Sequence, residues 1–245
     1  MCGRYTQHHT GAEISERFEL RELPLGMEPQ FNVAPTQMVP VIREEAREEG
    51  SRVLQGMKWG LVPPWAKDPT IGSRLINARG ETLAEKPAFR QALKQRRCLI
   101  PADGFFEWVK MGAAKQPMHI RRRDGDLFAF AGLWEEWRAP DGSPLRTCTI
   151  VTVAANELVT PIHDRMPAML LPEYEALWLD PSVTDAERLL PVLRPYPAGE
   201  MEAYPVSMRV NKAGVNDPDL VRRAEARSLF DDSREASDAG TPNSK

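Results

Sequence analysis

Three Asp–Gly dipeptides constrain the fold of this chain more than any other feature of its sequence. They stand at residues 103–104, 124–125 and 141–142. Asp–Gly favours the tight turns of β-hairpins because both residue types tolerate positive φ angles. The runs around them are rich in β-branched, aromatic and other apolar residues: 98–100, 105–109, 118–120, 127–134 and 147–153. The pattern therefore predicts antiparallel strands joined by tight turns.

Helices are expected between and after these strands. Capping boxes, in which a threonine precedes a glutamate by three residues, begin at Thr10, Thr82 and Thr184. Pro87 suits the first turn of another short helix, which places Phe89 inward. With 22 prolines and many short strands, the chain is expected to form an α+β fold and not alternating βαβ units.

Length and composition exclude several classes of protein. A chain of 245 residues that is 42% hydrophobic forms one large domain or two small ones. No stretch approaches the roughly 18 apolar residues of a membrane span, and no charged-then-apolar leader is present. Three cysteines without a CxxC spacing give no zinc pattern and favour a reduced compartment. We therefore expect a cytoplasmic protein without metal or cofactor.

Charge is distributed unevenly along the chain. The net charge of −3 argues against a strongly basic surface that binds nucleic acid over the whole protein. Residues 43–49 hold two arginines against four glutamates, and residues 226–245 hold three basic against four acidic residues. The remaining body is neutral and rich in arginine, which permits a local basic groove. Small and polar residues dominate 226–245, so we predict a domain over 1–225 and a disordered tail.

Cys2 stands directly after the initiator Met1. If Met1 is removed, Cys2 carries a thiol beside an α-amine whose pKa is about 7.7–8.0, so part of the amine is nucleophilic at neutral pH. Such a 1,2-aminothiol condenses with an aldehyde to a Schiff base, and the sulfur then closes a five-membered thiazolidine. The alternative is a cysteine that follows Met1 by chance, because terminal residues vary freely.

Two further segments hold candidate acid–base groups. In the expected strand at 105–109, Glu107 lies among aromatic neighbours, and desolvation there raises a carboxyl pKa toward neutrality. The alternative is an edge-strand glutamate that faces water. The loop at 161–167 holds His163, which can transfer protons near pH 7, and Arg165, which can bind a phosphate. Contacts that only stabilise the loop are the alternative here.

Polar and aromatic residues elsewhere offer weaker signals. Asn77 can orient a hydroxyl or carbonyl, and Arg79 is a second phosphate candidate, although each is more often structural. Trp65 belongs to a turn-rich aromatic segment that can stack on bases. The pair His8–His9 shows no ligand partners in the sequence, so we assign no metal site to it.

Seven blocks of sequence together resemble the SOS-response-associated peptidase (SRAP) family, whose members are abasic-site processing proteins. The resemblance covers about residues 2–210 in the family's order and spacing. Two positions depart from the family's common residues, since Phe106 stands where tyrosine is frequent and Tyr5 where phenylalanine is frequent. The blocks are MCGRY at 1–5, FNVAP at 31–35, WGLVP at 59–63, NAR at 77–79, RCLIPADGFFEW at 97–108, AGLW at 131–134 and HDRMP at 163–167.

The resemblance implies a single SRAP domain: an α+β fold with a bent, mainly antiparallel, barrel-like sheet and short flanking helices. It implies an exposed Cys2 as nucleophile, with Asn77 orienting it, Glu107 as acid–base and His163 assisting sugar-ring opening. The DNA-binding positions that it implies are Arg4, Arg79, Arg165, Trp65 and Trp108.

The function implied by this resemblance is a covalent thiazolidine cross-link to abasic sites in single-stranded DNA, formed after Met1 removal. A lyase side reaction and self-removal of Met1 are implied as well. We expect a monomer that binds no membrane and lies at the nucleoid when bound to DNA. Two other hypotheses remain open: an amidase or peptidase that uses Cys2 as an N-terminal nucleophile, and a noncatalytic single-strand binding module.

Overall fold

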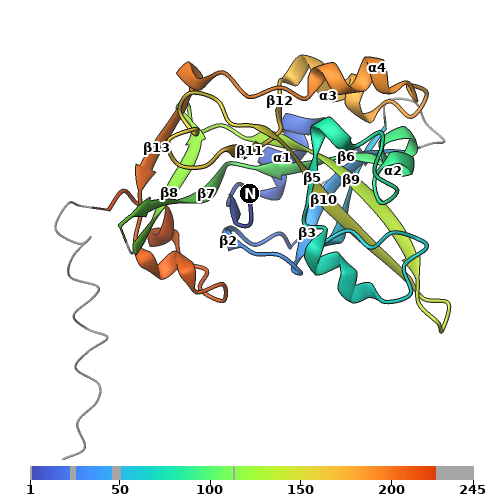
Figure 1. Ribbon diagram of the computed structural model, residues 1–245, viewed down its shortest axis with the longest axis horizontal. Helices are drawn as coiled ribbons and strands as arrows, with labels where there is room; N and C mark the ends of the chain where they lie inside the picture. The colour runs from blue at the N-terminus through green and yellow to red at the C-terminus, as the bar shows by residue number, and fades with distance from the viewer. Residues whose placement is uncertain (1, 23–25, 46–50, 113, 225–245) are drawn as a thin grey trace, which may run out of the picture.

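The computed structural model describes residues 2–22, 26–45, 51–112 and 114–224, and two β-sheets with short flanking helices make up this part of the chain (Figure 1). The strands are β1 (Tyr5–Gln7), β2 (Gln30–Val33), β3 (Met38–Glu44), β4 (Arg52–Trp59), β5 (Asn77–Arg79), β6 (Arg97–Ala102), β7 (Gly104–Met111), β8 (Ala114–Arg122), β9 (Phe128–Arg138), β10 (Pro144–Ala154), β11 (Arg165–Pro167), β12 (Met169–Leu170) and β13 (Met201–Pro205). The α-helices are α1 (Gly11–Phe18), α2 (Arg90–Gln95), α3 (Pro172–Leu179) and α4 (Ala186–Leu189). Short 3-10 turns are η1 (Pro69–Arg74), η2 (Gly80–Thr82), η3 (Leu190–Val192), η4 (Ala198–Glu200), η5 (Met208–Asn211) and η6 (Pro218–Val221).

The larger sheet closes on itself. Its hydrogen-bonded neighbours run β10–β4–β3–β6–β9, and β9 pairs again with β10, which completes a ring of strands. All of these pairings are antiparallel except β10 with β4. Closure leaves no free edge within the ring, so its backbone groups are satisfied internally. The predicted α+β fold with a barrel-like, mainly antiparallel core is confirmed.

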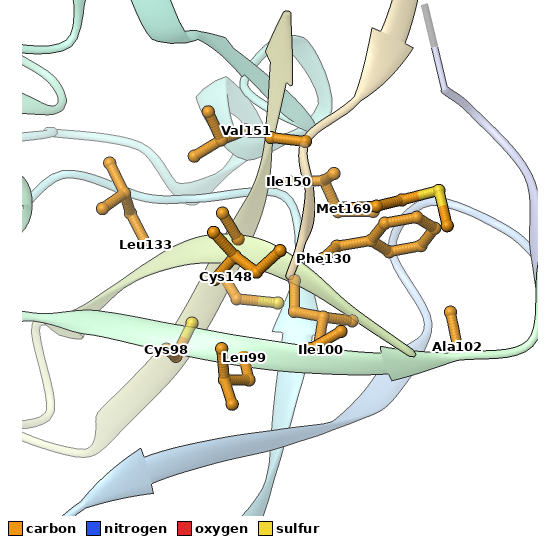
Figure 2. Close-up of a cluster of buried hydrophobic side chains, with 14 of the residues drawn as sticks. Cys98, Leu99, Ile100, Ala102, Phe130, Leu133, Cys148, Ile150, Val151 and Met169 are labelled. Carbon is orange, nitrogen blue, oxygen red and sulfur yellow. The ribbon is translucent and has the colours of Figure 1, made fainter. Parts of the chain in front are cut away.

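The interior of the ring is filled by aliphatic and aromatic side chains. Figure 2 shows Cys98 of β6 and Cys148 of β10 among them, beside Leu99, Ile100 and Phe130. All three cysteines of the chain are free and buried. Burial alone raises the pKa of the Cys148 thiol, so this sulfur stays protonated and behaves as a small apolar group.

The second sheet has the order β13–β8–β7–β1–β2 and lies beside the barrel, at the left of Figure 1. Its strand β1 pairs with β7, with Tyr5 opposite Phe105. This pairing brings the amino-terminal segment alongside the strand that carries Glu107. The sheet thereby positions Cys2, three residues before β1, next to the predicted acid–base group.

The Asp–Gly turns divide into two kinds. Only the dipeptide at 141–142 forms the predicted hairpin, between β9 and β10, with Gly142 at φ +84°. The dipeptides at 103–104 and 124–125 join strands of different sheets, because β6 and β9 belong to the barrel while β7 and β8 belong to the second sheet. The hairpin prediction was wrong at both. β7 and β8 do form a hairpin, with Gly112 at φ +63°, which the sequence analysis did not single out.

The helix starts were predicted with mixed success. The capping box at Thr10 is confirmed: its hydroxyl accepts from the Glu13 peptide nitrogen at 3.2 Å, and the Glu13 carboxylate accepts from the Thr10 peptide nitrogen at 2.7 Å. The box at Thr82 was wrong, because this residue ends η2. At the third position the cap is Asp185, one residue after the predicted threonine. Phe89 is buried as expected, but it caps α2, so Pro87 precedes that helix.

In the part of the chain that the structure describes, no helix combines the length and the apolar character that crossing a membrane requires. The predicted disordered tail at 226–245 lies outside the described residues. The domain boundary that we placed at 225 therefore stays a prediction.

Candidate active site at the amino terminus

Cys2 is fully buried, with 0% of its surface exposed, in a chain that retains Met1. Its sulfur lies 3.9 Å from the backbone oxygen of Arg4. Burial raises the pKa of the thiol, and the negative charge of nearby Glu107 raises it further. The exposed cysteine implied by the family resemblance is thus not found in this structure, although the sulfur does lie within the electrostatic range of Glu107.

Glu107 lies on β7 and is 4% exposed, so the alternative of a water-facing edge glutamate was wrong. Burial raises the pKa of its carboxyl, while the positive charge of His163 opposes this rise. Desolvation disfavours the ionised form, and a carboxyl so perturbed can exchange a proton closer to neutral pH. The side chain has the environment that a general acid–base group needs.

A cavity of about 470 Å³ brings Glu107 and His163 together. Trp108 belongs to the same lining and donates a hydrogen bond from its indole nitrogen to the Asn211 side chain at 2.8 Å. The full set of lining residues is Glu107, Trp108, Lys115, His163, Met208 and Asn211. Glu107 on β7 and His163 in the loop before β11 thus line the same cavity. Both are residues that the sequence predicted as acid–base groups.

Two contacts at Nδ1 orient the ring of His163. The peptide nitrogen of Arg165 lies 3.0 Å from Nδ1 in hydrogen-bond geometry. The carboxylate of Asp164 lies 2.9 Å from the same Nδ1 and pairs with the ring when it is protonated. A ring held in this way can present an N–H donor through Nε2.

Asn77 begins β5 and reaches the amino-terminal segment directly. Its amide nitrogen donates to the backbone oxygen of Cys2 at 2.9 Å. Its oxygen Oδ1 is buried and has no hydrogen-bond partner among the described residues. An unsatisfied buried acceptor costs free energy unless a ligand or a new donor reaches it. Asn77 therefore both holds residue 2 and offers an acceptor beside it.

Two of the predicted DNA-binding arginines are engaged within the protein. Arg4 donates from one nitrogen, Nη1, to the Asn32 side chain and to the Val210 backbone oxygen, both at 2.7 Å. Arg165 forms a bidentate pair with Glu81, at 2.6 and 2.9 Å, and also donates to the Thr152 backbone oxygen at 2.5 Å. Both arginines tie distant segments together, and a phosphate would have to compete with these partners.

The other predicted DNA contacts are accessible. Arg79 is exposed on β5, and Trp65 is 60% exposed in the turn before η1. The sequence analysis missed Lys115, which lines the cavity from β8 and lies directly opposite Lys110 of β7. Like charges opposite each other across two strands repel, so an anion between them is favourable. The signal that could have found this pair is the β7–β8 hairpin, whose turn at Gly112 was overlooked.

Fold and site together define a class of protein: an α+β barrel protein that holds an amino-terminal cysteine against a neighbouring sheet, beside a cavity with a carboxyl and an imidazole. The chain matches the model of the family described as SOS response associated peptidase (SRAP) over residues 1–213. It therefore belongs to the SRAP family, as the sequence blocks suggested.

Similar proteins cover nearly the whole chain. The abasic site processing protein YoqW of Bacillus subtilis is 48% identical over 224 residues, which are 90% of this chain and 99% of that protein. The abasic site processing protein HMCES of Gallus gallus is 34% identical over 223 residues, which cover 79% of this chain and 66% of that protein. A crystal structure of a Bacteroides thetaiotaomicron protein matches with a TM-score of 0.83 at 29% identity, covering 91% of this chain and all of the other.

Proposed function

We propose that this protein senses abasic sites in single-stranded DNA and traps them as a covalent thiazolidine on Cys2, after Met1 has been removed. Several relatives carry the name abasic site processing protein, and they span most of this chain. The observation that carries the proposal is the grouping of Cys2, held by Asn77, beside the Glu107 carboxyl of the cavity that His163 also lines.

The reaction begins with the sugar. An abasic deoxyribose is a closed hemiacetal, and it opens when the C1′–O4′ bond breaks. The imidazolium form of His163 gives a proton from Nε2 to O4′ and becomes the neutral ring, and the proton of the C1′ hydroxyl passes to the Glu107 carboxylate. The product is an aldehyde within reach of the amine that Met1 removal exposes on residue 2. The raised pKa of Glu107 matches this proton acceptor and donor role near neutral pH.

Two bonds then form at C1′. The amine of Cys2 attacks the aldehyde, nitrogen loses a proton, and the oxygen gains one to give a carbinolamine. Glu107 gives a proton to the departing hydroxyl, so water leaves and an iminium forms, and the nitrogen then returns a proton to the Glu107 carboxylate to leave an imine. The thiol adds across this imine: sulfur bonds to C1′, and the thiol proton goes to nitrogen. Because only an aldehyde reacts, specificity resides in this chemistry and not in the recognition of base edges.

DNA binding in this proposal rests on charge and stacking. Arg79 and Lys115 are exposed cations near the site, and Trp65 and Trp108 offer aromatic faces, each worth about 1–3 kcal/mol per stacked base. Arg165 contacts a phosphate, which replaces the Glu81 carboxylate as the partner of its guanidinium. Arg4 supports the site by holding β1 to Asn32 of β2 and to Val210 of η5.

Three finer points belong to the same proposal. The Schiff-base intermediate permits β-elimination, which gives a slow lyase reaction that cleaves the strand. The protein removes its own Met1, the peptidase step after which the family is named. It acts in the cytoplasm as a monomer that associates with the nucleoid when bound to DNA.

The test uses a single-stranded oligonucleotide whose uracil has been converted to an abasic site by uracil glycosylase. We expect a shifted band on a denaturing gel and an intact mass equal to the Met1-free protein plus the oligonucleotide. Cys2→Ala should give no adduct, with the buried Cys98 and Cys148 serving as internal controls. A protein that keeps Met1 and still forms the adduct would refute the aminothiol mechanism. Amide hydrolysis without an adduct would favour the N-terminal-nucleophile amidase instead.

A further inference from the structure

A second cluster of reactive side chains lies outside the candidate active site, where β1 ends against the corner between β6 and β7. Three of the chain's four histidines gather there around Asp103. Nδ1 of His8 lies 2.9 Å from one carboxylate oxygen, and Nδ1 of His9 lies 3.2 Å from the other. The ligand atoms of His8, His9 and Asp103 all lie within 4.8 Å of one another.

The carboxylate of Asp103 is buried, with 1% of its side chain exposed, and no lysine or arginine of the described residues forms an ion pair with it. The carboxylate has hydrogen-bond contacts with the Thr6 hydroxyl at 2.5 Å and with the His9 ring at 3.2 Å. A buried anion balanced only by imidazoles is a site where a cation is electrostatically favoured.

One nitrogen of the cluster lacks a proper partner. Nδ1 of His8 is buried and makes no hydrogen bond, since its 2.9 Å contact with Asp103 is an ion-pair distance without hydrogen-bond geometry. This nitrogen and the nearby carboxylate oxygen are both ligand atoms that one metal ion can use. The ring cannot turn away freely, because it stacks on Phe31 at 5.2 Å and on His9 at 5.3 Å.

The donors are close enough together to share one ion. Nδ1 of His8 and Nδ1 of His9 lie 2.9 and 3.2 Å from different oxygens of Asp103, and one ligand atom from each of the three residues lies within 4.8 Å of the others. Two imidazoles with one carboxylate select a borderline transition metal over Ca²⁺ or Mg²⁺, which prefer oxygen ligands.

The surroundings also provide the outer shell that metal sites require. Each oxygen of Asp103 accepts one additional bond, from the Thr6 hydroxyl at 2.5 Å and from the His8 peptide nitrogen at 2.6 Å. These bonds orient the carboxylate. The side chains of His8 and His9 are 33% and 20% exposed, which leaves a path for the ion and a fourth position for water.

From this geometry we infer that His8, His9 and Asp103 form a binding site for a divalent transition metal, of which Zn²⁺ is the representative. The ion links the end of β1 to the corner that begins β7. Both strands of the active site are therefore anchored at one point, six residues from Cys2.

The experiment titrates Zn²⁺ into untagged protein by calorimetry and uses the visible absorption of Co²⁺ to report ligand geometry. It is done on the Cys2→Ala variant, because a terminal aminothiol chelates metals itself. We expect one ion per chain and a tetrahedral Co²⁺ spectrum, both lost in the His8→Gln/His9→Gln double variant. Thr6→Val, which removes only the outer-shell bond, should weaken binding by about 10–100-fold.

His163→Gln is the matched control, because it removes a histidine elsewhere and should leave the titration unchanged. Circular dichroism confirms that each variant is folded. Equal Zn²⁺ affinity in the double variant, or the absence of saturable one-to-one binding in the parent, would overturn the inference. A shift of the loss to His163→Gln would place the ion in the cavity and would overturn it as well.

Discussion

The side-chain amide of Asn77 donates a hydrogen bond of 2.9 Å to the backbone oxygen of Cys2, across 75 residues of sequence. This contact joins β5, which pairs with the barrel strand β10, to the segment before β1 of the second sheet. The amide of Asn77 therefore links the barrel to the reactive end of the chain and helps to position Cys2.

Asn77→Ala should slow adduct formation roughly fivefold, because a hydrogen bond is worth about 1 kcal/mol net and its loss frees residue 2. The measurement is the single-turnover rate at saturating abasic oligonucleotide. Arg79→Ala on the same strand is the matched control: it should leave that rate unchanged, weaken binding, and reduce the salt slope by about 0.7. A saturated rate unaffected by Asn77→Ala would show that the amide has no positioning role.

The rate of adduct formation should rise with pH in two stages. The first follows ionisation of Glu107, whose pKa burial raises above the ordinary carboxyl value. The second follows the amine of Cys2, at about 7.7–8.0. Glu107→Gln should remove the first stage and keep the second, measured as a pH–rate profile. Identical profiles for variant and parent would mean that Glu107 transfers no proton in the rate-limiting step.

The raised pKa of Glu107 also predicts that the free energy of unfolding depends on pH, and it fixes the direction of that dependence. Because its folded-state pKa is raised, the native state binds more protons than the unfolded state once the pH exceeds the unfolded value of 4.5. The free energy of unfolding therefore falls as the pH rises from that value to the raised one. Glu107→Gln should reduce this fall in urea unfolding. Glu135, whose pKa burial also raises, contributes a fall that the variant retains.

The elements of the site were predictable to different degrees. Alternation along 105–109 correctly singled out Glu107, because the period of a strand is a local property. Its burial depends on η5 and on the loop at His163, which are nonlocal. The bidentate partner of Arg165 is Glu81, 84 residues away, and no spacing rule connects them. The sequence therefore identified reactive groups better than it identified the groups that restrain them.

The turns show the same limit. An Asp–Gly dipeptide favours a local chain reversal, and one forms at 141–142, where Gly142 has a φ of +84°. At 103–104 the chain only bends, and Gly104 already belongs to β7. Whether the flanking strands pair with each other depends on which partners their other edges find. At Asp103 the carboxylate is directed to Thr6, His8 and His9, and this link to β1 directs β7 into the second sheet. The tight turn predicted at 103–104 was therefore wrong, and the dipeptide does not encode which strands pair there.

Gly104 at this corner should not tolerate a side chain. A Cβ atom at this position would lie 2.2 Å from Nε2 of His119 and 2.9 Å from the Thr6 hydroxyl. Overpacking of a buried site typically costs about 1–3 kcal/mol, so Gly104→Ala should lower the free energy of unfolding by that amount. Gly199→Ala, where nothing lies within 4 Å, is the control and should stay within about 0.5 kcal/mol of the parent. Equal urea midpoints for the two variants would contradict the packing of this corner.

Glu81 should act as a competitor of DNA for Arg165. The two side chains share parallel hydrogen bonds of 2.6 and 2.9 Å, and the hydrogen bonds from Arg165 lower the pKa of Glu81, which keeps the pair ionised at neutral pH. Glu81→Gln weakens this pair and leaves the guanidinium available to a phosphate. We expect tighter binding of single-stranded DNA and a salt slope steeper by about 0.7, measured by fluorescence anisotropy.

Two controls separate this competition from a simple change in net charge. Glu85→Gln removes the same charge four residues away and should change the affinity less than Glu81→Gln does. Arg165→Ala in the Glu81→Gln background should cancel the gain, because the released guanidinium is then absent. If the gain persists without Arg165, the arginine contacts no phosphate, and its role is to fasten β11 to η2.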